Sequence, residues 1–184
     1  MENDSGDVVG EVLPVAARDA PSVDADGRLL ASGIDGVVVA YQRRHADHRG
    51  TLSEVVDLED PFWTEPVVYA YFLTVRPGRI KGWGMHRRQD DRYYVAWGSV
   101  RVVLYDGRTA SPTYGSFQQQ QFTDATPGLV RIPAGVWHAD QNWGDGDAMI
   151  MNFPTRPYDR GDPDKYRIDP ASGLIPFDWT LADG

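Results

Sequence analysis

The chain has no cysteine among its 184 residues, which excludes a disulfide framework and thiol catalysis. It has no apolar run of about 18 residues, so no transmembrane helix is expected. The amino-terminus lacks the basic-then-apolar order of a signal peptide, which makes the cytoplasm the default location. Positive charge is scarce, since the formal net charge is -9. This argues against a general binder of nucleic acid or anionic membranes, but allows a local basic pocket for a phosphorylated small molecule.

Glycine, proline and aromatic residues are plentiful, by contrast, and they separate short apolar segments. The sequence has 19 Gly and 13 Pro, and no amphipathic helix of ordinary length. This pattern predicts an all-β sandwich or barrel. We expect an acidic, loosely ordered arm over residues 1–33, with one short strand from Val8 to Val15, and one folded domain over residues 34–184. The expected strands of that domain include Val37–Tyr41, Thr51–Leu58, Val67–Val75, a pair within Arg92–Asp106, Ser116–Phe122, Leu129–Ile132 and Ala148–Phe153.

Two histidines follow turn signals in this pattern. Pro133, Gly135, His138 and Asn142 have the spacing P-x-G-x-x-H-x-x-x-N, which resembles the second motif of the cupin barrels. Pro fixes φ and Gly permits positive φ, so the chain turns sharply before His138. His86 stands ahead of a long strand pair, so a small barrel brings both histidines to one cavity. The alternative is a β-hairpin with one packed histidine.

Two histidines that face one cavity also raise the question of whether the barrel binds a metal ion. The residue two after His86 is Arg88, where a metal-binding cupin has a second histidine, and arginine cannot ligate a metal. His86 and His138 remain, with Asp91 as a third donor whose spacing differs from the usual motif. We therefore expect no cofactor and no bound metal, and keep a metal-binding cupin as an alternative.

Five short motifs in order give a more specific resemblance. They are Asp47-His48-Arg49-Gly50, Gly84-Met85-His86, Ser111-Pro112-Thr113-Tyr114-Gly115, Ile132-Pro133 through His138, and Ile168-Asp169-Pro170 through Asp178-Trp179. Over about residues 34 to 179 the chain resembles the dTDP-4-dehydrorhamnose 3,5-epimerases. The resemblance implies an all-β cupin jelly roll (a double-stranded β-helix barrel), a homodimer and catalysis without metal. It also implies proton removal next to the 4-keto group of a nucleotide-linked sugar, with return to the opposite face.

The resemblance assigns catalytic roles to two residues. His86 stands where the family has its base, and Asp169 stands where the family has the carboxylate that orients this base. The chemistry fits, because histidine titrates near neutrality and a buried carboxylate stabilises the imidazolium. The alternative for His86 is a packed histidine that bonds a backbone carbonyl. The alternative for Asp169 is a turn or cap residue before Pro170.

Substrate-binding residues follow from the same resemblance. Arg49 and Glu54 match residues that bind the nucleotide diphosphate, and His138 matches a second pocket histidine. Arg92 lies near the position of a substrate-binding lysine, and Lys81 is a further cation for the enolate oxygen. A surface charge beside a turn is the alternative for Arg49.

Other positions depart from the family pattern. Trp83 replaces an arginine, and Phe72 and Thr74 lie near positions that contact the sugar. Asn152, counted among the substrate-binding residues, replaces the tyrosine that returns the second proton, and an amide is no general acid. The replacement donors to be compared are Tyr71, Tyr94 and Tyr158.

The sequence therefore favours an epimerase or isomerase acting on a nucleotide-linked 4-keto-6-deoxysugar. One alternative is an epimerase-like cupin that performs a cyclisation, dehydration or isomerisation on another small molecule of natural-product biosynthesis. A second is a non-catalytic or metal-binding cupin. A homodimer is expected, because the strand-rich domain and its amino-terminal arm favour pairing across sheet edges.

Overall fold

The computed structural model describes residues 33–181, and the expected arm with its short strand lies outside them. The described part is all-β apart from one short 3-10 helix. The strands are β1 (Val38–Tyr41), β2 (Arg44–Asp47), β3 (Gly50–Ser53), β4 (Tyr71–Val75), β5 (Ile80–Met85), β6 (Asp91–Trp97), β7 (Val100–Asp106), β8 (Phe117–Phe122), β9 (Gly128–Ile132), β10 (Val136–Asn142), β11 (Ala148–Asn152) and β12 (Tyr166–Arg167), and the 3-10 helix is η1 (Pro170–Ser172). None of the helical structure within residues 33–181 is long and apolar enough to cross a lipid bilayer.

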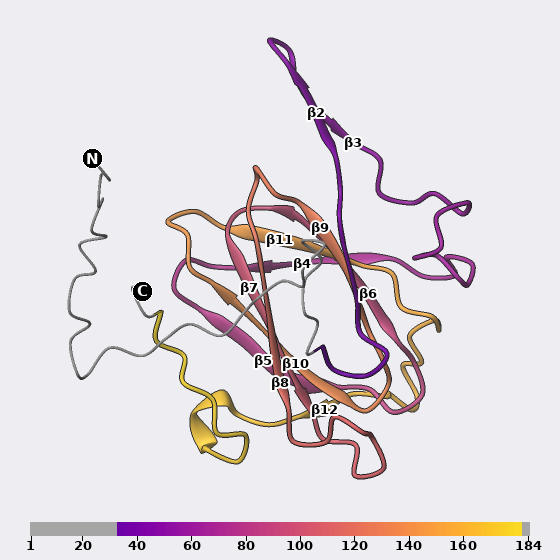
Figure 1. The fold of residues 1–184 in the computed structure, drawn as a ribbon, viewed down its shortest axis with the longest axis vertical. Coiled ribbons are helices and arrows are strands. Elements are labelled where there is room, and N and C mark those ends of the chain that lie inside the picture. The colour runs from indigo at the N-terminus through magenta and orange to yellow at the C-terminus, as the bar shows by residue number, and fades with distance from the viewer. Residues whose placement is uncertain (1–32, 182–184) are drawn as a thin grey trace, which may run out of the picture. The chain divides into compact units, whose positions relative to one another are not determined.

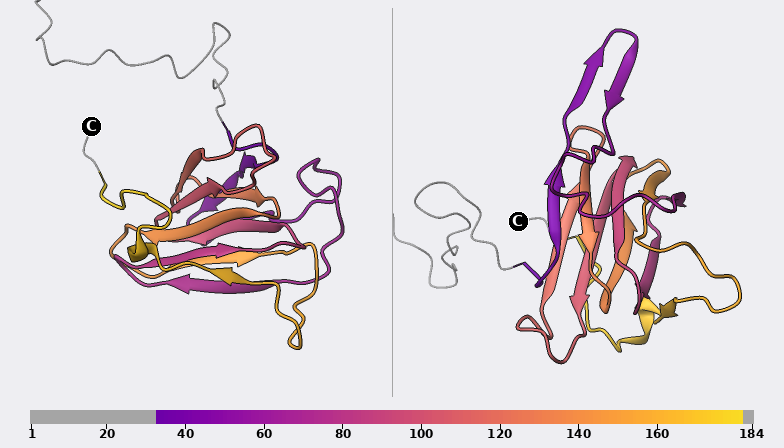
Figure 2. Two further views of the ribbon diagram at one scale, coloured as in Figure 1. Left: turned by 90° about the horizontal axis from the view of Figure 1, so that it is seen from below. Right: turned by 90° about the vertical axis from the view of Figure 1, so that its right-hand side faces the viewer.

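Ten of these strands form two five-stranded antiparallel sheets that face each other, and β2 and β3 form a separate two-stranded sheet (Figures 1 and 2). The first sheet has the order β1-β9-β6-β11-β4 and the second β12-β5-β10-β7-β8. Successive strands β4 and β5, β5 and β6, β9 and β10, and β10 and β11 alternate between the sheets. This confirms the predicted jelly roll.

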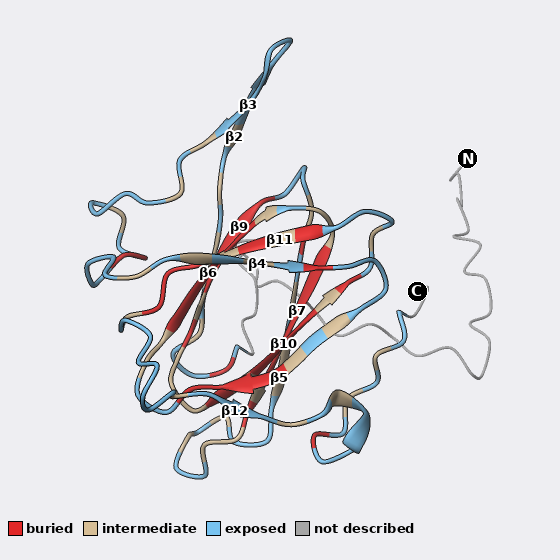
Figure 3. Ribbon diagram, turned by 180° about the vertical axis from the view of Figure 1, so that it is seen from behind, coloured by how far each residue is buried: buried red, intermediate tan, exposed pale blue. Residues whose placement is uncertain are grey.

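The main hydrophobic core lies between the two sheets, where the inward faces of the strands are buried (Figure 3). The side chains of β7 point alternately to the two faces of its sheet. Val102 and Leu104 therefore belong to this core, whereas Val103 packs on the opposite face. That opposite face carries an aromatic cluster with Trp83 at its centre, next to Trp179 at a ring distance of 5.3 Å. Trp83 is therefore a core residue of the second sheet.

The motif Ser111-Pro112-Thr113-Tyr114-Gly115 surrounds a buried carboxylate at the end of β7. Both the Ser111 hydroxyl, at 2.6 Å, and the Thr113 hydroxyl, at 2.7 Å, donate to Asp106 Oδ2. Arg108 Nε donates to the other oxygen at 2.8 Å. These bonds compensate for the burial of the charge and hold the β7–β8 connection.

The strand expected from Thr51 to Leu58 is shorter in the structure and belongs to the hairpin β2–β3. Asp47 Oδ1 accepts a hydrogen bond from the backbone N–H of Arg49 at 2.8 Å, which closes the turn, and β3 ends at Ser53. The hairpin projects from one end of the two-sheet body, and nearly all its residues are exposed (Figures 1 and 3).

Candidate active site

Three side chains from separate parts of the fold meet between the sheets. His86 follows β5, Asp91 begins β6, and His138 lies on β10. The turn at Gly135, where φ is 84°, donates its backbone N–H to the His86 carbonyl at 2.7 Å. Gly84 leaves room for the His138 ring, since a Cβ there would lie 3.1 Å from Nε2. The two cupin-like motifs are therefore joined directly, as their spacing predicts.

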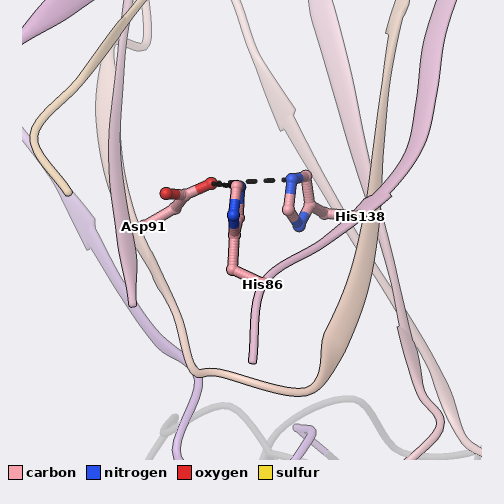
Figure 4. Close-up of side chains that lie close together, drawn as sticks. All are labelled: His86, Asp91 and His138. Carbon is pink, nitrogen blue, oxygen red and sulfur yellow. Dashed lines mark ion pairs between the residues drawn. The ribbon is translucent and has the colours of Figure 1, made fainter. Parts of the chain in front are cut away.

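Asp91 contacts both histidines (Figure 4). Its Oδ2 lies 3.3 Å from His86 Nε2 and 3.6 Å from His138 Nε2. The two imidazole rings stack with centroids 5.8 Å apart. All three residues are buried, with exposed fractions of 7% for His86, 1% for Asp91 and 4% for His138.

The second nitrogen of His86 contacts the backbone. Nδ1 makes a short hydrogen bond with the carbonyl of Asp164, in the segment before β12. The Asp164 carboxylate accepts from the backbone N–H groups of Arg87 at 3.0 Å and Arg88 at 2.7 Å. Because a carbonyl only accepts, this partner assigns the proton to Nδ1, and neutral His86 presents the Nε2 lone pair to Asp91.

The charges of this cluster are strongly coupled. Burial lowers the pKa of His86, but the hydrogen bond and charge of Asp91 and the Asp164 carbonyl outweigh it, so the pKa is raised overall. Burial raises the pKa of Asp91, but both histidines and the Asn152 amide hold it well below its usual range. Burial lowers the pKa of His138 to about 4, so this ring is neutral at pH 7.

The histidines line two cavities that have walls in common. His86 opens into a cavity of about 370 Å³ that Tyr71, Arg156 and Tyr158 also line. His138 lines a smaller one of about 90 Å³, together with Lys81 and Asp140. Two cations, Lys165 and Arg167, line both cavities. The larger cavity therefore combines a histidine, tyrosine hydroxyls and three cations.

Asp140 is an ionisable group that sequence reasoning did not find. Its carboxyl is 2% exposed, and Oδ1 makes no hydrogen bond within residues 33–181. Burial raises the pKa of Asp140 to about 7, against the lowering effect of Lys165. The smaller cavity therefore holds a carboxyl that is partly protonated at neutral pH.

The structure does not bring Asp169 into contact with His86, for which it was expected to be the partner. Asp169 is exposed and caps η1, where its carboxylate accepts the backbone N–H of Ala171 at 2.9 Å. Pro170 opens the helix, so an aspartate before it is a typical N-cap. Asp91 takes the place beside His86 instead.

Arg92 is also placed differently from the substrate-binding role expected for it. It is 1% exposed, and its Nε donates to the Phe153 carbonyl at 2.7 Å. Its other nitrogens donate to the carbonyls of Glu65 at 2.6 Å and Pro66 at 3.1 Å. Successive residues of a strand point to opposite faces, so Arg92 faces away from the side of β6 on which Asp91 contacts the histidines.

The remaining expected binding residues are spread over the molecule. Lys81 lines the smaller cavity only. Arg49 and Glu54 are exposed and line neither cavity, and Arg49 pairs with Asp47 at 2.6 Å. Within one chain these two residues lie apart from the histidines.

Asn152 is buried and bridges neighbouring groups without lining either cavity. Its Oδ1 accepts the backbone N–H of Arg92 at 3.1 Å, and its Nδ2 donates to the Tyr71 hydroxyl at 2.9 Å. Of the three tyrosines compared as proton donors, Tyr71 and Tyr158 line the His86 cavity, whereas Tyr94 is buried in another cluster.

Sequence reasoning missed Lys165, Arg167 and Arg156 as well as the role of Asp91. Alternation could have identified Asp91, which is in phase with the core residues Tyr93 and Val95 of β6. Lys165 and Arg167 lie beside and in the two-residue strand β12, which is too short to show a period. Arg156 lies in the connection between β11 and β12.

Comparisons with known proteins agree with this architecture. The family model described as dTDP-4-dehydrorhamnose 3,5-epimerase matches residues 31–182. The chain is 35% identical over 147 residues to the spore coat polysaccharide biosynthesis protein SpsL of Bacillus subtilis, which covers 80% of this chain and 97% of that protein. It is 34% identical over 149 residues to the probable low-salt glycan biosynthesis epimerase Agl13 of Haloferax volcanii, with 80% and 95% covered.

A solved structure gives the same result. The crystal structure of a dTDP sugar isomerase from Desulfovibrio desulfuricans superposes with a TM-score of 0.73 at 31% sequence identity. The match covers 82% of this chain and 94% of the other.

Proposed function

Since the chain belongs to the dTDP-4-dehydrorhamnose 3,5-epimerase family, an enzyme family of sugar epimerases, we propose that it acts beside the carbonyl of a nucleotide-linked 4-keto-6-deoxysugar. The observation that carries this proposal is the contact between His86 and Asp91 at the wall of a cavity of about 370 Å³. A histidine with a buried carboxylate partner is suited to remove a proton from carbon next to a ketone.

His86 Nε2 accepts the proton in the first step. The Nδ1–H group stays hydrogen-bonded to the Asp164 carbonyl, which fixes the ring and its tautomer. Asp91, 3.3 Å from Nε2, stabilises the imidazolium that forms. The electron pair of the broken C–H bond moves onto the carbonyl oxygen and gives an enolate.

The enolate oxygen needs positive charge, and Lys165 is the cation best placed to supply it. Lys165 lines the cavities of both histidines, whereas Lys81 lines only the smaller one. Arg156 and Arg167 line the His86 cavity as well and are suited to a diphosphate. Lys165 is exposed in the single chain, so its charge stabilises the enolate most when the bound substrate excludes water from the cavity.

Tyr71 returns a proton to the carbon. Tyr71 lines the His86 cavity, and its hydroxyl accepts a hydrogen bond from Asn152. That bond occupies an oxygen lone pair, so the hydroxyl proton is directed away from Asn152. The proposal assigns to Tyr71 the proton return that Asn152 cannot perform.

The proposed enzyme works as a homodimer. The hairpin β2–β3 projects from the sheets and carries Arg49 outside the cavities of its own chain (Figure 2). An isolated two-stranded hairpin is only marginally stable in water, which favours a partner surface. We place the nucleotide between the cavity of one protomer and the hairpin of the other. Sedimentation that finds only a 20.5 kDa monomer at micromolar concentration contradicts this assembly.

The test of the function uses dTDP-4-keto-6-deoxyglucose in D₂O. The wild-type protein is expected to incorporate deuterium beside the carbonyl, and His86→Ala to lose this exchange. Asp145→Asn, which alters an exposed turn residue between β10 and β11 that lines neither cavity, is the control and keeps it. Wild-type protein that exchanges no proton contradicts the proposed substrate and favours a cupin acting on another small molecule.

A further inference from the structure

Asp140 is a buried ionisable group that the proposed chemistry does not use. It is 2% exposed, it lines the smaller cavity, and its Oδ1 has no hydrogen-bond partner within residues 33–181. A buried carboxyl without a partner is costly, because it loses its hydration and gains no hydrogen bond in return. The fold holds this carboxyl at a cost in stability, which points to a role in binding.

The pairing of β5 with β10 places a lysine beside this carboxyl. His138 stands opposite Gly84, and Asp140 stands opposite Lys81, so β5 has one more residue than β10 between the two pairs. Directly opposed residues of an antiparallel pair have their side chains on the same face of the sheet. Lys81 and Asp140 therefore share one face.

The extra residue in β5 determines which face that is. Residues three apart on a regular strand point to opposite faces, but Ile80 and Trp83 both pack in the aromatic cluster on the outer face of the second sheet. The bulge thus turns Lys81 toward the smaller cavity. Gly82 makes the bulge possible, since a Cβ there would clash with the Cβ of Ala139.

Most side chains in the wall of the smaller cavity can form hydrogen bonds. Besides Asp140 these are Lys81, Tyr93, His138, Lys165 and Arg167. Burial and the charge of Asp91 raise the pKa of Asp140 to about 7, and Lys165 and Lys81 act against them. The carboxyl therefore exists near neutral pH in a form that accepts hydrogen bonds and in a form that donates one. A hydroxyl group suits both forms, because it donates and accepts.

The size of the smaller cavity limits what it can hold. Its volume is about 90 Å³, whereas a water molecule takes about 30 Å³ of liquid. It has room for a substituent of a few heavy atoms, but not for a sugar ring. Lys165 and Arg167 also line the cavity of His86, so a ring in that larger cavity can direct a substituent into the smaller one.

The two strand positions expected near the sugar point away from both cavities. Phe72 and Thr74 on β4 are exposed and line neither, whereas Leu73 between them lines the smaller cavity. The ring hydroxyls of a sugar bound at His86 therefore need other partners.

We propose that Asp140 recognises one ring hydroxyl of the substrate and that the smaller cavity is the pocket for this hydroxyl. The inference rests on the proposed function, because the sugar ring must lie in the His86 cavity for its hydroxyl to reach Asp140. His138 lines the same pocket and is neutral at pH 7, so its ring is a second hydrogen-bond partner for the hydroxyl.

The experiment compares dTDP-4-keto-6-deoxyglucose with two analogues that lack the 2-hydroxyl or the 3-hydroxyl. Deuterium exchange in D₂O gives kcat/KM for each sugar with the full chain. The wild type is expected to prefer the complete sugar over one of the analogues by about 10²-fold or more, because that analogue leaves the buried carboxyl unpaired. Asp140→Leu has a side chain of similar volume and is expected to reduce this preference to less than about tenfold.

Two further variants control this comparison. Asp140→Asn retains a side chain that accepts and donates hydrogen bonds, so it is expected to retain the preference. Asp145→Asn alters an exposed carboxylate that lines neither cavity and retains it as well. A preference that persists undiminished in Asp140→Leu, or disappears in Asp145→Asn, overturns the role of Asp140.

Thermal unfolding separates recognition from a structural role. Asp140→Leu removes a buried carboxyl without a partner, so its Tm is expected to equal or exceed that of the wild type. A Tm several degrees lower assigns the carboxyl to the stability of the fold and overturns the recognition role.

The same measurements distinguish this inference from the proposed function. Wild-type protein that exchanges the complete sugar and both analogues equally well overturns the hydroxyl pocket and supports the proposed function. Wild-type protein that exchanges none of the three sugars overturns both.

Discussion

Asn152 on β11 and Tyr71 on β4 stand opposite each other in adjacent strands, and the amide nitrogen of Asn152 donates to the tyrosine hydroxyl at 2.9 Å. The orientation of the amide is fixed, because its oxygen accepts the backbone N–H of Arg92. Burial, together with the charge of Asp91, raises the pKa of Tyr71 to about 12, so the hydroxyl stays protonated at neutral pH. The pair holds a proton at the cavity that His86 lines.

Removing that hydroxyl separates proton removal from proton return. Tyr71→Phe is expected to lower the rate of stereochemical inversion by about 10²–10⁴-fold, while deuterium exchange falls by less than about tenfold. NMR of the sugar in D₂O measures both rates in one sample. Tyr158→Phe alters an exposed hydroxyl of the same cavity and is the control. Inversion at the wild-type rate in Tyr71→Phe rules out this donor.

Substitutions of Asp91 and Asp169 compare the two carboxylates that are candidates for the partner of His86. Asp91→Asn is expected to lower exchange by about 10²–10⁴-fold, because the imidazolium of His86 loses its counter-charge. Asp169→Asn leaves exchange unchanged and changes stability by less than about 0.5 kcal/mol, since asparagine also caps helices. The reverse order of effects would restore Asp169 as the partner of His86.

Lys165 and Lys81 test which cation meets the enolate. Lys165→Met is expected to lower exchange by about 10²–10³-fold at saturating substrate. Lys81→Met, at the smaller cavity, lowers it by less than about tenfold. A larger loss in Lys81→Met places the reacting oxygen in the smaller cavity.

Substitution of Asp106, which lies outside the candidate site, tests how much its buried carboxylate contributes to the stability of the fold. Hydrogen bonds from Arg108, Ser111 and Thr113 outweigh the effect of burial and hold the pKa of Asp106 far below its usual range. Asp106→Asn is expected to lower the free energy of unfolding by about 3 kcal/mol at pH 7. Because the folded pKa is depressed, this stabilisation is complete above the unfolded pKa of about 4 and decreases as the pH falls below it. Urea unfolding at pH 7 and pH 3 measures the difference, and equal effects at both pH values would exclude the charge as its cause.

The sequence was sufficient for the barrel and for its two histidines, because turn residues and strand alternation are local signals. Pro133 and Gly135 set the turn that places His138, and the apolar alternation of β6 and β7 places the core. Alternation within β6 also separates Asp91 from Arg92, and a resemblance applied position by position overlooked that geometry.

The parts of the site that the sequence did not predict depend on contacts between residues that are distant in the sequence. Lys165 lines the His86 cavity because β12 pairs with β5, with Tyr166 opposite Met85, 81 residues away along the chain. A strand of two residues has no local pattern from which such a pairing can be predicted. Asp169 stands at the position of the family's catalytic carboxylate and also directly before Pro170, which is a favourable N-cap position. In the structure Asp169 takes the capping role.

The most direct test of His86 as the base is the rate of solvent deuterium incorporation beside the sugar carbonyl, measured by NMR. We expect exchange by the wild type and a loss of at least about 10²-fold in His86→Ala, with Asp145→Asn unchanged. Exchange that continues at the wild-type rate in His86→Ala would contradict it.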